Sequence, residues 1–413
     1  MTSNIQAPLA SSNHIDCDIA IIGGGVAGLW LLDLLRNRGY DAVLCEQQAL
    51  GGAQSIASQG MIHGGIKYAL GAALTGASEA IARMPERWRS CLDGSGEVDL
   101  RGVRVVANEY HMWSNGQLGK LNSFFASHAL RGRVEELAAD DYPEVFRHPD
   151  FSGTVHKLHD LVLDVTSLLE FLSAPHTNRL ISGRAANTRF GSASADAAKN
   201  IEAVTLADGR ELYAQQFIFT AGAGNSEFCT ALKQAGHAHA PATQLRPLHQ
   251  AFVKHPDLTE LFAHCLTGIR GAEPRLTITT HPLESTEPKT SNTHGWYIGG
   301  HLATAGVKRT TANQIDVTRR ELTATLPWID WQAADITTLR IDRAEPRQQL
   351  GAKPDEACLV RCGNALLCWP TKLSLVPDLG DQVLNALDPP AGAAVQDNLP
   401  PSHLNIARAP WLL

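Results

Sequence analysis

The sequence lacks any uninterrupted apolar run of the roughly 18 to 20 residues that a membrane-spanning helix needs. It also lacks a long stretch of Lys and Arg, and its formal net charge is -7 at pH 7, which excludes the basic face of a nucleic-acid-binding protein. Internal repeats and low-complexity tracts are missing too. A chain of 413 residues with these absences is expected to be a globular enzyme of two domains without a nucleic-acid partner.

Cysteine occurs eight times, but never in a C-x-x-C pair or with the spacing of Cys and His metal ligands. Cys358 and Cys362 come nearest to such a pair and have three residues between them. We therefore expect reduced thiols, a cytoplasmic location and no metal site.

The two ends of the sequence are irregular. Residues 1–14 are polar and lack the basic stretch and the apolar core of a secretory signal, so we expect a disordered leader. The C-terminal Trp411, Leu412 and Leu413 allow two interpretations, a weak peripheral contact with a membrane or packing on the protein itself. Packing is favoured, because one Trp with two Leu is a weak membrane anchor.

A glycine-rich turn near the N-terminus carries the strongest signal. An apolar strand, Ile19–Ile22, leads into Gly23, Gly25 and Gly28, then into an amphipathic helix and a second strand that ends at Glu46. The glycines allow a tight turn, the close approach of a pyrophosphate and close packing of helix on strand. The acidic residue is placed to accept hydrogen bonds from a ribose. The pattern predicts a dinucleotide site but does not distinguish FAD from NAD.

Hydrophobic periodicity and turn residues predict the order of the remaining elements. Helices are expected at residues 57–70, 76–92, 118–130, 161–172, 314–326 and 371–387. Strands are expected at residues 103–113, 179–182, 200–206, 211–219, 339–343, 358–362 and 365–369, with longer antiparallel strands within 244–281 and 293–301. The Asp208–Gly209 pair predicts a hairpin between two of them.

Three short segments resemble the D-amino acid oxidase and glycerol-3-phosphate dehydrogenase superfamily of FAD-dependent oxidoreductases. Residues 51–68, with the run Met-Ile-His-Gly-Gly-Ile-Lys-Tyr at 61–68, resemble the flavin-contacting loop of that superfamily. Residues 217–225 resemble its glycine turn beneath the adenosine, and residues 369–379 resemble its C-terminal flavin-contacting helix. The three segments also follow one another in the superfamily's order, which favours FAD as the cofactor.

The resemblance implies an α/β fold with a Rossmann-like FAD-binding domain around a parallel sheet and a substrate domain built on an antiparallel sheet. The FAD-binding domain is expected to be discontinuous, at residues 15–92, 155–230 and 339–388. The substrate domain is expected at residues 93–154 and 231–338, followed by an irregular tail at 389–413.

The glycine turn and the resemblance together predict the FAD-binding residues. Serine and glutamine side chains offer donors and acceptors, glycines let a flat ring approach the backbone, and a helix that starts near Thr371 directs its amides at the flavin. The predicted set is Gly23, Gly25, Val26, Ala27, Gly28, Glu46, Gln47, Ser55, Ser58, Gln59, Gly60, Met61, Ala221, Gly222, Thr371, Lys372 and Leu373.

Three residues are candidates for the chemistry. A neutral His63 can accept a substrate proton, although a structural histidine bonded to backbone explains it equally well. Lys372 matches a superfamily lysine beside the flavin and can stabilise negative charge on it. Arg343 is favoured over Arg340 and Arg347 as the residue that grips a substrate anion.

The substrate-binding residues are expected on both domains. Lys67 and Tyr68 match an Arg and a Tyr that the resemblance places near the substrate. Lys67 keeps the positive charge of that Arg but lacks its bidentate fork of donors. Arg246, Tyr297 and Arg343 complete this set, and for Arg246 a salt bridge is the competing interpretation. His249 and His301 lie on the same predicted sheet and carry little weight in a chain with 17 histidines.

The sequence thus predicts a FAD-dependent dehydrogenase or oxidase. Its substrate is expected to be a small, anionic hydroxy acid, polyol derivative or amino acid, and its electron acceptor to be oxygen, a quinone or a carrier protein. Two alternatives remain open. One is a flavin monooxygenase that uses NAD(P)H. Such an enzyme requires a Gly-Asp pair where this chain has Gly363 and Asn364, which argues against this alternative. The other is a non-enzymatic binding protein on the same scaffold.

Overall fold

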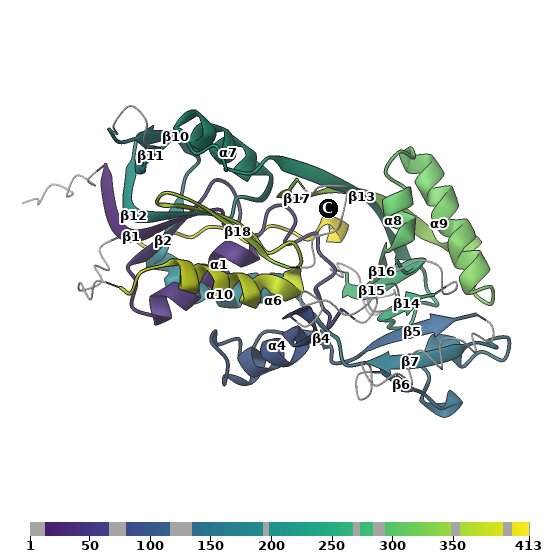
Figure 1. Cartoon of the computed structure of the whole chain (residues 1–413). Coiled ribbons are helices and arrows are strands. Elements are labelled where there is room, and N and C mark those ends of the chain that lie inside the picture. Colours follow the sequence, from purple (N-terminus) through teal and green to yellow (C-terminus); the bar gives the residue numbers. More distant parts are fainter. Residues whose placement is uncertain are drawn as a thin grey trace, which may run out of the picture.

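The computed structural model has two lobes, each built around an eight-stranded sheet (Figure 1). It describes residues 13–65, 80–115, 134–192, 198–266, 273–283, 294–347, 356–390 and 399–412. The predicted helix at 118–130 lies outside these ranges, as does most of the predicted leader.

The first lobe contains a five-stranded parallel sheet with antiparallel strands at its margins. The strand order of the parallel part is β9 (Leu180–Ser182), β2 (Ala42–Glu46), β1 (His14–Ile22), β12 (Glu211–Phe219) and β19 (Ala365–Trp369). The antiparallel strands are β10 (Ala185–Phe190), β11 (Ile201–Leu206) and β18 (Cys358–Cys362). The hairpin predicted at Asp208–Gly209 is confirmed, because Thr205 pairs with Glu211 around it.

Alternating side chains of β1 enter two separate cores, which explains why the strand is apolar on both faces. Ile19 and Ile21 pack on one face with α1 (Val26–Asn37), α4 (Met84–Asp93), α6 (Val165–Ser173) and α10 (Val376–Ala386). Ala20 and Ile22 pack on the other face, which α7 (Asn225–Gln234) covers. The parallel sheet therefore has helices on both faces, as expected for a Rossmann-like domain.

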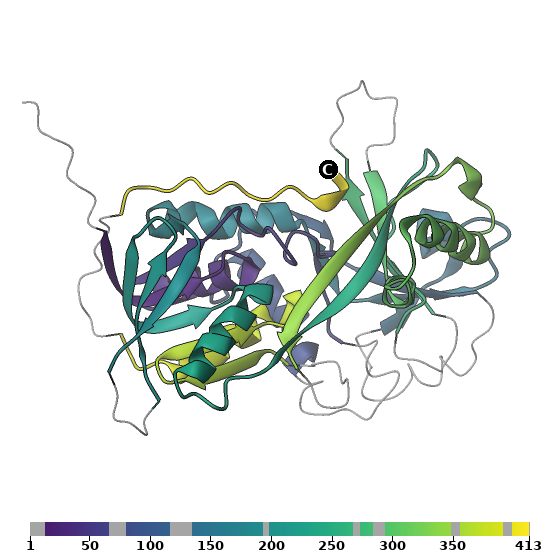
Figure 2. The same ribbon diagram turned by 90° about the horizontal axis from the view of Figure 1, so that it is seen from above.

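The second lobe is an eight-stranded, mainly antiparallel sheet. Its order is β17 (Asp335–Pro346), β13 (Thr243–Lys254), β16 (His294–Gly299), β15 (Leu276–Pro282), β14 (Ala263–Cys265), β5 (Tyr110–Ser114), β7 (Thr154–Leu158) and β6 (Val134–Glu136). Helices α8 (His301–Ala305) and α9 (Thr311–Thr325) lie beside it (Figure 1). The paired strands β13 and β17 reach from this lobe to the first lobe (Figure 2).

A three-stranded sheet joins the lobes and corrects two predicted helices. It consists of β3 (Met61–Ile62), β8 (Leu161–Leu163) and β4 (Val105–Ala107). The helix predicted at 161–172 therefore begins with β8 instead. The helix predicted at 57–70 is replaced by a turn and β3 over its described part, and residues 66–70 lie outside the described ranges. Helix α6 starts only after Asp164, whose carboxylate accepts a hydrogen bond from the Ser167 amide at 2.9 Å and caps the helix.

The predicted domain boundaries at residues 155 and 339 also need correction. They fall inside β7 and β17, and both strands belong to the second sheet. Residues 155–158 and 339–346 are thus part of the second lobe. The sequence pattern could not show this, because each boundary depends on pairing with a strand far away in the chain.

The C-terminal segment runs along the first lobe and ends on the second (Figure 2). Its Ser402 amide donates to the carbonyl of Thr177, and Ile406 forms a bridge with Leu50. The Trp411 ring then packs against aromatic rings of the second sheet, namely those of Phe252, His281 and Tyr297. This confirms the prediction that Trp411 packs on the protein. None of the helices in the described ranges has the length and hydropathy of a membrane span.

Burial beneath this tail makes His281 a source of acid sensitivity. Desolvation lowers its pKa from 6.5 to about 3, and nearby Asp164 opposes the shift only in part. Between these pH values the unfolded chain binds a proton that the folded protein excludes, so stability falls as the pH drops below 6.5. We expect the free energy of unfolding of His281→Gln to fall less steeply in this window than that of the wild type. Chemical denaturation at several pH values, with exposed His403→Gln as the control, measures the two slopes, and equal slopes would contradict the assignment.

Candidate active site

A cavity of about 630 Å³ lies between the two lobes and has the size of a ligand-binding site. It brings together segments from the β1–α1 turn to the residues that follow β19. Most of the predicted site residues line it: Gly23, Gly25, Val26, Ala27, Glu46, Gln47, Ser55, Ser58, Gln59, Gly60, Met61, His63, Ala221, Gly222, Arg246, Arg343, Thr371, Lys372 and Leu373. Lys67 and Tyr68 lie outside the described residues.

The glycine turn forms one end of the cavity. Gly23 has a φ of 117°, and a side chain there would meet the backbone of Thr220 at 2.7 Å. Gly28 does not line the cavity, because it packs behind the turn, where an added Cβ would lie 2.0 Å from the carbonyl O of Gly23. The first turn of α1 therefore stays close to the strand and presents its N-terminus to the cavity. This is a suitable place for a pyrophosphate.

Two side chains complete this end of the cavity. The carboxylate of Glu46 accepts hydrogen bonds from the amides of Gly24 at 2.7 Å and Gln48 at 3.0 Å, which hold it at the cavity wall. The hydroxyl of Ser55 accepts a bond from the Val26 amide at 3.1 Å. An added Cβ at Gly25 would lie 3.0 Å from the same hydroxyl, so the space at the helix N-terminus depends on this glycine. The arrangement fits the adenosine and pyrophosphate of FAD.

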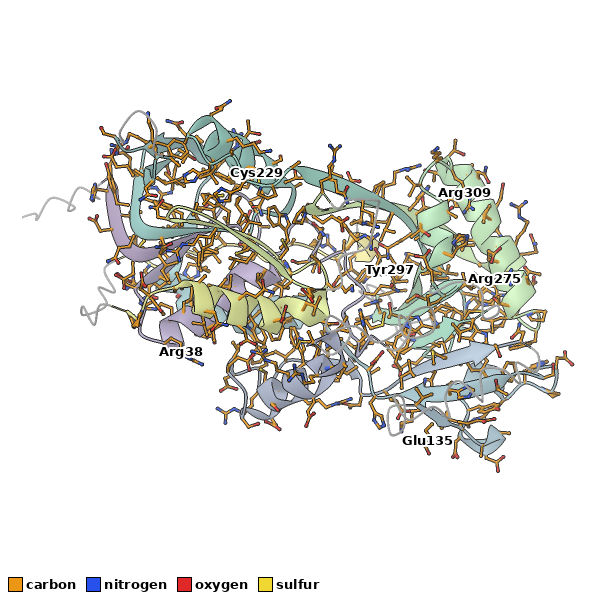
Figure 3. The ribbon with its side chains drawn as sticks, in the orientation of Figure 1. Arg38, Glu135, Cys229, Arg275, Tyr297 and Arg309 are labelled. Atoms are coloured by element: carbon orange, nitrogen blue, oxygen red, sulfur yellow. The ribbon has the colours of Figure 1, made fainter. Side chains whose placement is uncertain are left out.

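The loop that includes residues 55–60 is anchored to the second sheet by a buried hydrogen-bond network. The side-chain amide of Gln59 donates to the carbonyls of Thr277 at 3.1 Å and Tyr297 at 2.9 Å. The Tyr297 hydroxyl lies 3.1 Å from the carbonyl O of Ala57 and 2.8 Å from Oε1 of Gln250. Tyr297, which was predicted to bind substrate, does not line the cavity. It lies on β16 of the second sheet (Figure 3).

We expect Tyr297→Phe to lower the free energy of unfolding by about 1–3 kcal/mol, because it removes the hydroxyl that supplies the hydrogen-bond donor beside the buried oxygens of Ala57 and Gln250. The loop beside the cavity should also hold its flavin less tightly. Thermal unfolding and flavin release on dilution measure both effects. Tyr142→Phe in the second lobe is a suitable control, since this residue is only half buried. Equal melting temperatures for the two variants would argue against an anchoring role.

His63 and Lys372 approach the cavity from segments about 300 residues apart, and Ser374 links them. The Ser374 hydroxyl accepts a hydrogen bond from the His63 amide at 2.9 Å, and its carbonyl accepts one from the Trp88 indole at 3.0 Å. His63 is itself buried. The bond to Ser374 fixes the backbone of His63, and the residue lines the cavity, where an imidazole can exchange a proton with a bound molecule.

The helix predicted to start near Thr371 begins later. Thr371 has a φ of 59°, and the Lys372 amide donates across it to the carbonyl of Pro370 at 2.6 Å, which forms a γ-turn. Lys372 is extended, so a 3-10 turn starts at Leu373 and α10 follows at Val376. Thr371, Lys372 and Leu373 still line the cavity, but as irregular backbone rather than as the first turn of α10.

Two arginines lie opposite each other on β13 and β17. Arg246 pairs with Arg343 across the ladder, and both line the cavity. The buried carboxylate of Glu345 accepts a hydrogen bond from Arg246 Nε at 2.9 Å, so Arg246 forms a salt bridge within the cavity wall. Arg340 instead binds the carbonyl of Val307 at 2.7 Å and, like Arg347, does not line the cavity.

Sequence reasoning missed several polar residues of the cavity, including Gln250, Glu273, Thr304 and Glu345. Arg246, Leu248 and Gln250 alternate along β13 and share its cavity face, so the period of two was an available signal. The neighbouring His249 is buried on the other face, where its ring bonds Gly306 and Thr338. His301 lies at the start of α8 with its side chain mostly exposed, and it does not line the cavity.

The fold and the cavity define a flavin-dependent oxidoreductase, and comparison with known proteins agrees. The profile of the DAO family, described as FAD dependent oxidoreductase, matches residues 18–338. The chain belongs to this family and is an enzyme that uses FAD. A similar relative is the probable FAD-dependent oxidoreductase PA4991 of Pseudomonas aeruginosa, with 47% identity over 377 residues that cover 91% of each protein.

Solved structures show the same fold. The crystal structure of PA4991 superposes with a TM-score of 0.77 at 39% identity, covering 96% of this chain and 98% of that one. Glycine oxidase from Bacillus cereus gives a TM-score of 0.62 at 14% identity, covering 90% and 96%. L-α-glycerophosphate oxidase from Mycoplasma pneumoniae, solved with FAD bound, gives 0.61 at 11% identity, covering 92% and 98%.

Proposed function

We propose that this enzyme oxidises a small anionic hydroxy acid, polyol derivative or amino acid. The observation that carries the proposal is the pair of arginines, Arg246 and Arg343, that lie opposite each other on β13 and β17 and line the cavity. Lys372 adds a third cation, and three carboxylates, those of Glu273, Asp342 and Glu345, also line this part of the cavity. A guanidinium on the wall of a confined cavity presents a fork of donors that suits an anionic substrate group.

Each residue has a distinct role in this proposal. Arg343 binds the anionic group of the substrate with its planar fork of donors and so fixes its orientation. His63 accepts the proton of the substrate hydroxyl or amino group. Lys372 stabilises negative charge that develops on the cofactor side of the cavity. FAD, when bound, supplies the hydride acceptor at N5.

The names of two proteins with the same fold support the substrate class. Glycine oxidase and L-α-glycerophosphate oxidase are named for an amino acid and a phosphorylated polyol. Both compounds are small and carry an anionic group. The proposal extends this shared chemistry to the present enzyme without choosing between an alcohol and an amine.

A substrate panel tests the proposal. The holoenzyme is assayed with hydroxy acids, amino acids and polyol phosphates, each paired with a neutral ester, amide or dephosphorylated analogue, and with oxygen or a quinone as acceptor. We expect turnover of at least one anion and a much lower kcat/KM for its neutral partner. Equal activity on charged and neutral partners would refute the anionic substrate class.

A further inference from the structure

Two histidines and one cysteine form a compact cluster in the first lobe, away from the cavity. His237 and His239 lie between α7 and β13, and Cys362 ends β18. One ligand atom from each residue falls within 4.8 Å of the other two. Within the described ranges, no other set of three such side chains comes together in this way.

The distances suit a tetrahedral metal site. The thiol Sγ of Cys362 lies 3.6 Å from Nε2 of His239. A tetrahedral zinc ion with Zn–S of about 2.3 Å and Zn–N of about 2.0 Å separates its sulfur and nitrogen ligands by roughly 3.5 Å. The pair therefore already has the required separation. His239 is exposed and can adjust, whereas His237 and Cys362 are fixed by burial.

The surroundings of His237 prepare it as a ligand. Its Nε2 lies 3.0 Å from the carbonyl O of Lys199, a contact that leaves Nδ1 to bind a metal. Such a bond from the second ring nitrogen to a backbone carbonyl is usual for zinc-binding histidines. The glycine at position 363 leaves space for the imidazole of His237, since an added Cβ at Gly363 would lie 3.0 Å from Cε1 of that ring. Nε2 of His239 contacts the carbonyl of Arg361 at 2.7 Å and exchanges this contact for the metal.

We propose that His237, His239 and Cys362 form a binding site for a zinc-type divalent cation, with water as the fourth ligand. Two imidazoles and a thiolate are soft donors, which favour zinc over magnesium or calcium. The exposed side of His239 admits the water. The bound ion links the segment after α7 to the β18–β19 hairpin, so its expected role is structural.

Cobalt(II) is the probe that tests the site, since its tetrahedral complexes absorb in the red, where oxidised flavin is transparent. The holoenzyme is prepared without a histidine tag, treated with a chelator and titrated with Co²⁺, then with Zn²⁺. We expect one equivalent of tetrahedral Co²⁺ that Zn²⁺ displaces, and a higher melting temperature with Zn²⁺.

Matched variants separate this site from adventitious binding. Cys362→Ser and His239→Ala should abolish the tetrahedral spectrum and the shift in melting temperature. Cys358→Ser, on the same strand, and the exposed His403→Ala should retain both. The exposed position of His239 makes its variant informative even if Cys362→Ser does not fold. A wild-type protein without the tetrahedral band, or a band that survives in His239→Ala, would overturn the proposal.

Discussion

The Gly28→Ala variant is expected to lose its flavin. The added methyl group would lie 2.0 Å from the carbonyl O of Gly23 and 2.9 Å from Oγ1 of Thr220. Neither neighbour can move without shifting the turn that precedes α1, because the Thr220 hydroxyl itself donates to the Gly23 carbonyl at 2.9 Å. Helix α1 must therefore move away from β1, and its N-terminus leaves the position required by the pyrophosphate.

Overpacking of this kind costs about 1–3 kcal/mol of stability. The purified variant should be colourless, and added FAD should bind much more weakly, as measured by the flavin-to-protein absorbance ratio and by fluorescence quenching. Gly191→Ala is the matched control, since the nearest atom to its added Cβ is 3.9 Å away. A yellow Gly28→Ala protein with wild-type affinity for FAD would show that the turn does not hold the cofactor.

The Arg343→Met variant is expected to have the largest effect on activity toward an anionic substrate. A hydrogen bond to a charged group is worth about 1.5–3 kcal/mol, which corresponds to a loss of roughly 10- to 150-fold in kcat/KM. Arg246 cannot fully replace Arg343, because its guanidinium already binds the carboxylate of Glu345. Arg343→Lys should retain part of the activity, since it keeps the charge and loses the bidentate fork.

Two controls make this kinetic prediction specific. Arg347→Met, near the end of the same strand pair, should leave kcat/KM unchanged, since Arg347 is exposed and does not line the cavity. Activity toward a neutral analogue should be equally low in the wild type and in Arg343→Met. If Arg343→Met matches the wild type on the anionic substrate, Arg343 does not bind the anion.

The sequence predicted the local part of this architecture well. The β1–α1 turn is formed by neighbouring residues, and each of its glycines is required for a separate steric reason. The roles of Gly23, Gly25 and Gly28 could therefore be predicted from the sequence alone. The apolar strand predicted at Ile19–Ile22 is also present, and its alternating side chains enter two cores. The resemblance of residues 51–68 then favoured FAD, which the family membership confirms.

The parts that failed depend on contacts between distant segments. Gln250 faces the cavity only because β13 pairs with β16 and β17, and Tyr297 turns away from it to support the loop at Ala57. The late start of α10 follows from the γ-turn at Thr371, which has a positive φ. A threonine in the sequence does not predict this rare conformation. Pro377 and the acidic Asp378 in the first turn of α10 were local signs of the true helix start.

We expect the cavity between the lobes to hold FAD and the substrate itself, rather than a nicotinamide, to reduce it. The most direct test mixes the yellow enzyme with its anionic substrate in the absence of oxygen and follows the flavin absorption. We predict that the substrate bleaches the flavin in a single turnover, that deuterium at the oxidised carbon slows the bleaching, and that NADPH has no effect. Bleaching by NADPH, together with an unchanged spectrum in the presence of every anionic candidate, would show that a nicotinamide and not an anionic substrate reduces the flavin.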